Sequence, residues 1–413
     1  MRYILHSDLN NFYASVECLY NPSIRNKAVV VVGDQEKRHG IVLAKNYNAK
    51  KYGIKTGDTI GEARNKCDEE LVAVKVNFDR YIRISKIIKD VYREYSNRVE
   101  SFGIDEAWID ITHRVKNFDE AYKLAEEIRE RIVTDFGLTV SIGVSYNKVF
   151  AKLGSDLKKP NATTLITDKN YKQLIYPLPV EDLLYVGRAT KEKLHKNNIF
   201  TIGQLAQTDA KFLHLTFGKV GDTLGNFARG EDVSEVKQVG DEQDIKSVGN
   251  STTCPYDLTE NNQVKNIIYI LAESVACRMR EKKLYCSGVA LWIKDEMLES
   301  FERQTTLISA TNLAQDIANA CYDLFKKCYN WKRNIRAIGV RAINLNKGVV
   351  QCNLFDDPSS SDKQLKLELM IENLRARFGY NIIGRASVLA DSKIREINPM
   401  EDAHKIHPVS FFS

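Results

Sequence analysis

The sequence of 413 residues has no long apolar run, and none approaches the roughly 18 consecutive apolar residues that a membrane-spanning helix requires. We therefore expect no association with a membrane. We also expect no secretory signal, because Asp8 interrupts the stretch that such a signal keeps apolar. We therefore expect a cytoplasmic protein. Internal repeats and long low-complexity runs are absent too, so the domain organisation must be derived from periodicity and turn signals.

Patterns typical of zinc sites are also absent. The eight cysteines form no C-x-x-C pair, and no histidine stands beside them at the spacing of zinc ligands. In a reducing cytoplasm cysteines need not pair. We interpret them as core residues or free thiols.

The composition that is present is that of a globular protein, with 43% hydrophobic and 28% charged residues. At about 100 to 200 residues per domain, the length favours two to four domains. The net charge of +6 is mild, but it is unevenly spread: basic blocks surround an acidic, apolar-poor connector at residues 231–243. This pattern is typical of modular contact with nucleic acid, although chance can also produce it.

Strand and helix signals in the first part of the chain predict an α+β sheet with helices on one face. A helix over residues 119–136 carries its apolar residues on one stripe, and Gly137 suits its left-handed end. A tight bend at residues 103–106 separates two short strands. Further strands are expected at residues 3–9, 28–32, 41–43 and 138–144.

The rest of the chain contains a helical segment, a connector and a second α+β segment. Residues 181–230 look mainly helical, and the few apolar residues of 231–243 predict a linker. Residues 244–350 have the order strand, helix, strand, strand, helix, strand, which predicts a separate split-βαβ domain. In the tail, residues 351–413, a helix is expected at 363–378, and the sequence assigns it no role.

Asp8, Asp105 and Glu106 are the candidate catalytic residues. Asp8 ends an otherwise apolar strand, and the other two occupy the tight bend. Carboxylates that converge at the edge of a buried sheet repel each other unless a metal neutralises them. Two Mg²⁺ ions about 3.5 to 4 Å apart would do so and would assist nucleotide transfer to a 3′ hydroxyl. Alternatively, Asp8 only ends a strand and the acidic pair only makes a turn.

Four stretches around these residues decide between the two interpretations: HSDLNNFYASVE (6–17), KNYNAKKYGIKTGD (45–58), GIDEAWID (103–110) and SIGVSYNKVFAKLGSDLKKPN (141–161). In this order and spacing they resemble the Y-family translesion DNA polymerases, the group that includes the bacterial polymerase IV and polymerase V catalytic subunits. The resemblance runs from residue 1 to about residue 350.

The resemblance implies a multidomain right-hand polymerase with a ferredoxin-like palm, small fingers, a helical thumb and a βαββαβ little finger. The expected domains are the palm (1–10 and 77–165), the fingers (11–76), the thumb (166–230), the linker (231–243), the little finger (244–350) and the tail (351–413). It also implies low-fidelity, template-directed synthesis past damaged bases without proofreading. Primer–template DNA and deoxynucleoside triphosphates would be the substrates, and we expect a monomer.

The resemblance also assigns roles to single residues. Asp8, Asp105 and Glu106 match the metal-binding carboxylates, and the carbonyl of Leu9 supplies a further ligand. Tyr13 matches the steric gate, whose ring leaves no room for a 2′ hydroxyl; as an alternative, Phe12 and Tyr13 are both core aromatics. The residues expected to bind the nucleotide are Phe12, Tyr13, Tyr47, Lys50 and Lys159. Many family members have arginine in place of Lys50, and lysine lacks its bidentate fork.

Two further motifs suggest contacts with DNA and with a protein partner. Residues 184–194 resemble a helix-hairpin-helix, with Tyr185 at the usual position of the first hairpin glycine, and an ordinary helical hairpin is the alternative. Residues 351–355 resemble the bacterial sliding-clamp peptide, in which Gln351, Leu354 and Phe355 would bind the clamp. The alternative is a domain end that buries its last apolar residues against its own sheet.

Two other functions share part of this pattern. A catalytically silent DNA-damage scaffold would use only the basic domains and the clamp peptide, and the intact carboxylates argue against it. A palm-domain nucleotide cyclase would share the carboxylates but would need neither a thumb, a little finger nor DNA. The sequence does not indicate the preferred lesion, the need for accessory subunits or the polymerase IV or V branch.

Overall fold

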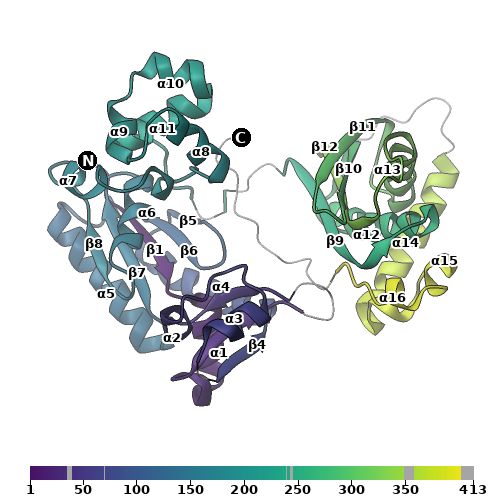
Figure 1. Ribbon diagram of the computed structural model, residues 1–413, viewed down its shortest axis with the longest axis horizontal. Coiled ribbons are helices and arrows are strands. Elements are labelled where there is room, and N and C mark those ends of the chain that lie inside the picture. Colours follow the sequence, from purple (N-terminus) through teal and green to yellow (C-terminus); the bar gives the residue numbers. More distant parts are fainter. Residues whose placement is uncertain (35–39, 69, 239, 242–244, 348–357, 401–413) are drawn as a thin grey trace. The chain divides into compact units, whose positions relative to one another are not determined.

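The computed structural model describes residues 1–34, 40–68, 70–238, 240–241, 245–347 and 358–400. The described residues fold into two compact units, the first formed by residues 1–33 and 41–241 and the second by residues 245–347 and 358–400 (Figure 1). Within these ranges, no helix combines the length and the apolar character that crossing a membrane demands.

A five-stranded sheet forms the centre of the first unit, in the order β5-β6-β1-β7-β8. Its central strand, β1, is buried at all six positions and runs antiparallel to both β6 and β7. The short strand β8, which we did not predict, extends the sheet parallel to β7. The strand bounds are β1 (Ile4–Leu9), β5 (Val99–Ser101), β6 (Glu106–Asp110), β7 (Val140–Ser145) and β8 (Thr163–Leu165).

Helices cover both faces of this sheet, and our expectation of one covered face is therefore wrong. The helices α4 (Phe78–Tyr95) and α5 (Phe118–Phe136) share one core cluster with the sheet. The helix α6 (Lys148–Leu157) packs on β1 and β7 from the other side, where Ala151 joins a separate cluster with Trp108. The contact is so close that a Cβ atom on Gly143 would lie 1.8 Å from the carbonyl oxygen of Ala151.

The expected fingers contain a small mixed sheet in the order β3-β2-β4. Strand β4 pairs parallel to β2, and we did not predict it because its residues alternate only weakly between buried and exposed. The elements are α1 (Phe12–Tyr20), β2 (Ala28–Val32), β3 (Val42–Lys45), α2 (Tyr47–Lys51), α3 (Ile60–Lys66) and β4 (Leu71–Lys75).

The expected thumb consists of short helices around one apolar core. Tyr185 has a φ angle of 70°, so it adopts the left-handed conformation that a glycine usually supplies in a hairpin. The helices are α7 (Tyr171–Ile175), α8 (Arg188–Lys196), α9 (Ile202–Gln207), α10 (Ala210–Phe217) and α11 (Lys219–Arg229).

Much of the segment expected to be a linker packs against the first unit. The Arg2 guanidinium donates hydrogen bonds to the backbone carbonyls of residues 232–234. Val236 is fully buried beside Trp108, and the amide of Lys237 donates to Glu100. Residues 232–237 of the expected linker are therefore fixed to the first unit, by hydrogen bonds of their backbone groups and by the burial of Val236.

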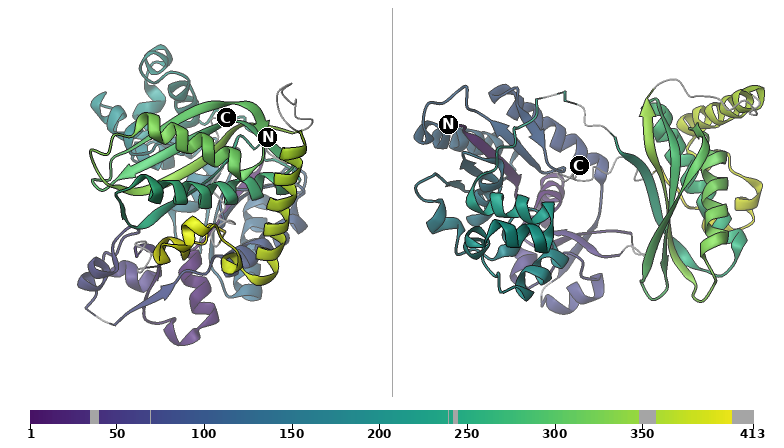
Figure 2. Two further views of the ribbon diagram at one scale, coloured as in Figure 1. Left: turned by 90° about the vertical axis from the view of Figure 1, so that its right-hand side faces the viewer. Right: turned by 90° about the horizontal axis from the view of Figure 1, so that it is seen from above.

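The second unit is a four-stranded antiparallel sheet, in the order β11-β10-β12-β9, with helices on one face (Figure 2). The order of the elements along the chain is the predicted βαββαβ. The core lies between the sheet and the helices α12 and α13. The bounds are β9 (Ser247–Leu258), α12 (Asn261–Glu281), β10 (Leu284–Asp295), β11 (Ser300–Thr311), α13 (Ala314–Cys328) and β12 (Ile335–Lys347).

The helices of the tail pack on this second unit and complete its core. They are α14 (Pro358–Phe378), α15 (Ala386–Leu389) and α16 (Ser392–Arg395). Val388 and Ile394 are buried in the same cluster as α12 and α13. Tyr256 of β9 donates a hydrogen bond to Asp391, and Arg375 and Arg385 both pair with Glu273 of α12.

Glu368 of α14 makes a buried polar contact between the tail and the second unit. Helix α13 has Leu313 at its N-cap, a residue with no side-chain acceptor. The carboxylate of Glu368 accepts from the amide of Ala314 at 3.0 Å instead, and it pairs with Arg280 of α12 at 2.9 Å. The tail therefore supplies the cap of a helix that lies more than 40 residues earlier in the chain.

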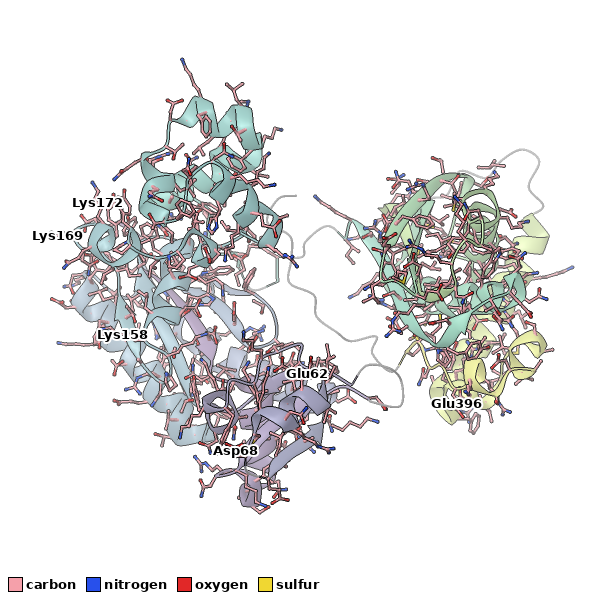
Figure 3. The ribbon with its side chains drawn as sticks, viewed as in Figure 1. Glu62, Asp68, Lys158, Lys169, Lys172 and Glu396 are labelled. Atoms are coloured by element: carbon pink, nitrogen blue, oxygen red, sulfur yellow. The ribbon has the colours of Figure 1, made fainter. Side chains whose placement is uncertain are left out.

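We predict that Glu368→Ala destabilises the second unit by about 2 to 4 kcal/mol, because it removes a cap and leaves Arg280 with less compensation in a buried site. Urea unfolding followed by hydrogen exchange of the α13 peptides measures this change in the full chain. Glu396→Ala, at an exposed tail position (Figure 3), should change stability by less than about 0.5 kcal/mol. Equal effects of the two variants would contradict the capping role.

Candidate active site

The pairing of β1 with β6 brings the three predicted carboxylates to one end of the sheet. In this antiparallel register Asp8 lies opposite Glu106. Asp105 immediately precedes β6, and its carbonyl accepts a hydrogen bond from the amide of Leu9 at 3.1 Å. Residues almost 100 positions apart in the sequence thus become neighbours. Asp8 is buried, and Asp105 and Glu106 are half-buried.

Helix α4 holds the bend that carries Asp105 and Glu106. Lys89 is buried, and its Nζ donates to the carbonyl of Gly103 at 2.7 Å. Ser85, one turn earlier, donates to the carbonyl of Ile104. Sequence reasoning missed both residues, because they lie in the middle of an amphipathic helix and their partners are backbone atoms far along the chain.

Two lysines are the partners of two of the carboxylates. Lys159 Nζ lies 2.7 Å from Asp8 Oδ2 and also 2.7 Å from Asp156, and Lys152 Nζ lies 2.6 Å from Glu106 Oε2. Among the residues that the structure describes, no three His, Cys, Asp or Glu side chains are grouped so that they could hold a metal ion as they stand. The carboxylates are neighbours, but each of these two is directed to its own ammonium group.

Burial disfavours ionisation of the carboxylates at this site. Burial raises the pKa of Asp8 to about 7, and the charges of Glu106 and Asp105 act in the same direction against Lys159. Burial also raises the pKa of Asp105, and Glu106 adds to the shift. Burial opposes ionisation of Glu106 as well, but the neighbouring His6 ring and Lys152 lower its pKa to about 2. A buried set of hard oxygen donors that repel one another fits divalent cations.

His6 lies beneath this site and is not a candidate base. Its ring is fully buried, and burial lowers its pKa to about 4, so it is neutral at pH 7. Its Nδ1 lies 2.8 Å from Ser155 Oγ, and its Nε2 lies 3.5 Å from Glu106 Oε2. These contacts agree with our interpretation of His6 as a strand residue.

Tyr13 lies at the start of α1, on a platform of other aromatic rings. It stacks on Tyr81 of α4, with ring centroids 4.4 Å apart and planes 9° apart, and it meets Phe78 edge-on. Tyr81 is itself fixed, since its hydroxyl donates to Glu17 at 2.8 Å. The charge of Asp105 contributes, after burial, to raising the pKa of Tyr13 to about 12, so the ring also lies near the carboxylates.

Phe12 differs from Tyr13 in its environment. Only 3% of Phe12 is exposed, whereas Tyr13 is half-buried, so these two adjacent aromatics are not equivalent core residues. Sequence reasoning missed Tyr81 and Phe78 as supports for Tyr13, because helix α4 lies more than 60 residues away in the chain.

Tyr47 and Lys159 lie near Asp8, whereas Lys50 lies beside Tyr47. Burial raises the pKa of Tyr47, and the charges of both Lys159 and Asp8 act on it. Lys50 Nζ lies 5.7 Å from the Tyr47 ring centroid. Helix α2 is fixed to β2 by its cap, Asn46, whose Oδ1 accepts from the amides of Ala49 and Val29.

Lys45 adds a cation that sequence reasoning missed. It ends β3, and burial together with the charge of Lys50 lowers its pKa. Two lysines close enough to repel each other at the edge of the fingers favour an anionic ligand. The side chains of Lys158, Lys169 and Lys172, by contrast, are exposed on the outer surface (Figure 3).

The predicted clamp-binding residues Gln351, Leu354 and Phe355 lie outside the described residues.

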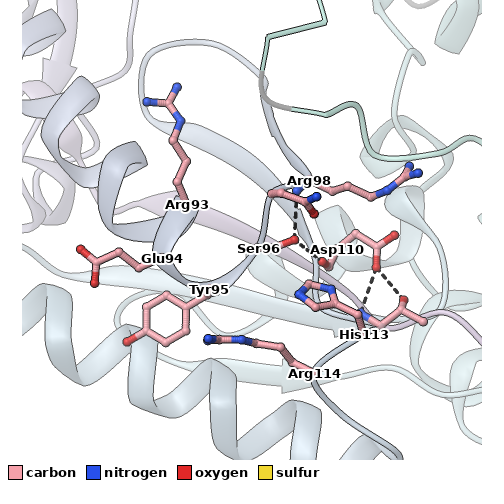
Figure 4. A pocket seen from close by; sticks show the side chains of 10 residues that line it. Arg93, Glu94, Tyr95, Ser96, Arg98, Asp110, His113 and Arg114 are labelled. Atoms are coloured by element: carbon pink, nitrogen blue, oxygen red, sulfur yellow. Dashed lines mark hydrogen bonds between the residues drawn. The ribbon is translucent and has the colours of Figure 1, made fainter.

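A pocket of about 530 Å³ opens at the other end of β6, around Asp110 (Figure 4). Three of its charged side chains form ion pairs outside the pocket, Arg93 with Asp90, Glu94 with Arg131 and Arg98 with Glu235, and we assign it no chemistry.

Comparison with protein-family models gives three matches along the chain. Residues 7–156 match the impB/mucB/samB family, and residues 245–354 match the C-terminal domain of that family. Residues 181–232 match the thumb domain of DNA polymerase iota. These matches follow the chain in the order expected for palm and fingers, thumb and little finger.

Whole-chain relatives agree with the family models. The chain is 50% identical to DNA polymerase IV of Acetivibrio thermocellus over 96% of this chain and all of that one. It is 33% identical to DNA polymerase IV of Clostridium acetobutylicum, over 94% and 98% of the two chains. Among solved structures, a Y-family polymerase chimera of Dbh and Dpo4 has the same fold, with a TM-score of 0.73 and 22% identity, over 84% of this chain and 100% of that one.

Fold and relatives together define a right-hand DNA polymerase with a little-finger domain. The chain belongs to the Y family of DNA polymerases. It is a DNA-directed DNA polymerase that carries out translesion synthesis, as the resemblance implied, and the α+β right-hand fold is confirmed. Polymerases of this family act on DNA and deoxynucleoside triphosphates and use divalent metal ions.

We predict that Tyr13→Ala admits ribonucleotides, because the ring that would exclude a 2′ hydroxyl is removed from its platform. The ratio of kcat/KM for deoxynucleotides over ribonucleotides should fall by about 100-fold, or about 3 kcal/mol of discrimination. Single-nucleotide insertion kinetics measure the ratio. Tyr20→Ala, at the exposed end of the same helix, is the control. An unchanged ratio for Tyr13→Ala would remove Tyr13 from this role.

Proposed function

We propose that Asp8, Asp105, Glu106 and the carbonyl of Leu9 hold two Mg²⁺ ions at the primer end. The observation that carries this proposal is the β1–β6 register, which makes the three carboxylates neighbours. The burial of these oxygen donors supports it, since burial and the repulsion between the carboxylates raise the pKa of Asp8 and Asp105. When bound, the ions would polarise the primer 3′ hydroxyl and neutralise charge on the leaving pyrophosphate.

The lysines and Tyr47 would bind the triphosphate of the incoming nucleotide. Lys159 forms an ion pair with Asp8 at the site. Its loop is held in place by the backbone amide of Asn161, which donates a hydrogen bond to the side chain of Asn10. Tyr47 offers a phenol beside it, and Lys50 offers a point charge rather than the bidentate fork of arginine. We expect a less oriented grip on the phosphates than in relatives with arginine.

Tyr13 and Phe12 would select and support the sugar. The stacking of Tyr13 on Tyr81 fixes the ring, so that it excludes a 2′ hydroxyl by its bulk. Phe12 lies buried behind it and limits its movement. Proton removal from the primer hydroxyl would rely on solvent, since the neutral His6 is buried beneath the carboxylates.

DNA would be held by charges on the second unit and by the thumb. Buried core residues alternate along β12, so Arg341 lies on the sheet face opposite α12 and α13. Backbone phosphates bound there would give salt-sensitive affinity without sequence preference. The hairpin before α8, with Tyr185 in a left-handed conformation, would present amides to a phosphate.

The cellular setting follows from similarity and composition. The named relatives are DNA polymerase IV proteins, so we propose that this chain serves the polymerase IV branch. Among the residues that the structure describes, the seven cysteines form no disulfide bond, which supports the reducing cytoplasm expected from the sequence. Small fingers that press little on the nascent pair would explain low fidelity.

We also propose that residues 351–355 bind the bacterial sliding clamp. The segment follows β12, the last strand of the little finger, and precedes α14 of the tail. Its sequence, with Leu354 and Phe355 as apolar anchors, supports insertion into a partner's pocket.

Primer extension tests the carboxylate proposal. We expect Asp105→Ala to lower the extension rate by about 1,000-fold or more, because a metal ligand is lost. Asp68→Ala, an exposed acidic position in the fingers (Figure 3), should extend like the unmodified enzyme. Extension by Asp105→Ala at the normal rate would contradict the assignment. If the unmodified chain did not extend a primer, the silent scaffold would be the better description.

A second experiment tests the clamp peptide. Alanine at both Leu354 and Phe355 should abolish the stimulation of synthesis by the sliding clamp, because both apolar anchors are lost, and leave synthesis without the clamp unchanged. Processivity on a long primed template, with and without loaded clamp, measures this. Equal stimulation of the variant and the unmodified enzyme would discard the motif.

A further inference from the structure

Lys152 is a charged residue at the active site that the assignments above leave without a role. It lies on α6, and its Nζ contacts Glu106 Oε2 at 2.6 Å. Both side chains are largely buried, with 17% and 19% of their surface exposed. Lys152 is distinct from Lys159, which contacts another carboxylate of the site, Asp8.

The surrounding structure fixes where this ammonium group lies. Helix α6 contacts the sheet at Gly143 of β7, a position at which no larger residue fits, so the helix has no room to move closer to the sheet. The carbonyl of Lys152 accepts from Ser155 Oγ, which also meets the His6 ring. The Lys152 side chain passes over the Phe102 ring, with 5.2 Å from Nζ to the ring centroid. The position of the Lys152 ammonium group is therefore set by the packing of helix α6 and by the neighbouring side chains.

Glu106 needs such a partner when no metal ion is bound. A largely buried carboxylate without a counter-charge is costly, and the adjacent Asp8 and Asp105 would repel it. Lys152 Nζ lies 2.6 Å from Glu106 Oε2, closer than His6 Nε2 at 3.5 Å, so Lys152 is the nearest cationic partner of this carboxylate. A divalent ion on the same carboxylate would have to displace this ammonium group or bind beside it.

We propose that Lys152 is a positioning residue: it acts as the counter-cation of Glu106 before metal binds, holds that carboxylate in place and lowers the affinity of the site for divalent ions. The proposal rests on the metal-binding role proposed for Glu106. It accounts for the observation that the carboxylates are neighbours yet are not grouped as a metal site. A site of this kind stays ordered without metal and loads its ions fully only when a substrate adds further ligands.

The affinity for Mn²⁺ tests this proposal without any polymerase assay. We expect Lys152→Met to bind Mn²⁺ about tenfold more tightly than the unmodified enzyme in the absence of DNA and nucleotide, because a repelling charge is removed. Electron paramagnetic resonance of free Mn²⁺ measures the affinity. Lys152→Arg, which keeps the charge, should stay within about twofold. Lys158→Met, an exposed lysine that ends the same helix, should have no effect.

Thermal unfolding separates this role from a merely structural one. Metal-free Lys152→Met should melt about 2 °C or more below the unmodified enzyme, and saturating Mn²⁺ should close the gap, because binding to the folded state stabilises it. A melting point lowered equally with and without Mn²⁺, with unchanged or weaker affinity, would overturn the proposal. If the unmodified enzyme bound no Mn²⁺ at the carboxylates at all, the metal-binding assignment itself would fail instead.

Discussion

The antiparallel pairing of β1 with β6 is the constraint on which the active site depends. It sets Asp8 opposite Glu106 and brings the bend with Asp105 to the same end of the sheet. Because side chains alternate between the two faces of a sheet, a slip of one residue in this register would turn Asp8 to the opposite face. The fully buried β1, covered by helices on both sides, makes such a slip costly. The register of β1 against β6 that packs the core is therefore the same register that places the carboxylates.

The charges at this end of the sheet are balanced by residues from two helices, α4 and α6, and from the loop that follows α6. Lys159 and Lys152 pair with Asp8 and Glu106, and Lys89 holds the bend from below. None of these contacts is a surface ion pair, since each involves a buried or half-buried partner. A polymerase that must remain folded between rounds of metal and nucleotide binding requires such compensation, because carboxylates left alone at this site would destabilise the sheet.

The sequence predicted the fold class, the element order of the little finger and the residues proposed for the site, because local periodicity and four motifs carry that information. It did not predict β4 or β8, which are short and depend on neighbours in the sheet. The packing of α6 on the second face also escaped prediction, since it depends on the missing side chain of Gly143. Tyr81, Lys89, Lys152 and Glu368 act through partners far along the chain, and no local pattern distinguishes them from ordinary helix residues.

A crystal structure with primer–template DNA, a non-hydrolysable deoxynucleotide and Mn²⁺ tests the central claim most directly. The account predicts two anomalous-scattering peaks about 3.5 to 4 Å apart, bounded by the carboxylates of Asp8, Asp105 and Glu106. Peaks bound elsewhere, or carboxylates that remain directed to lysines while the nucleotide is in place, would contradict it.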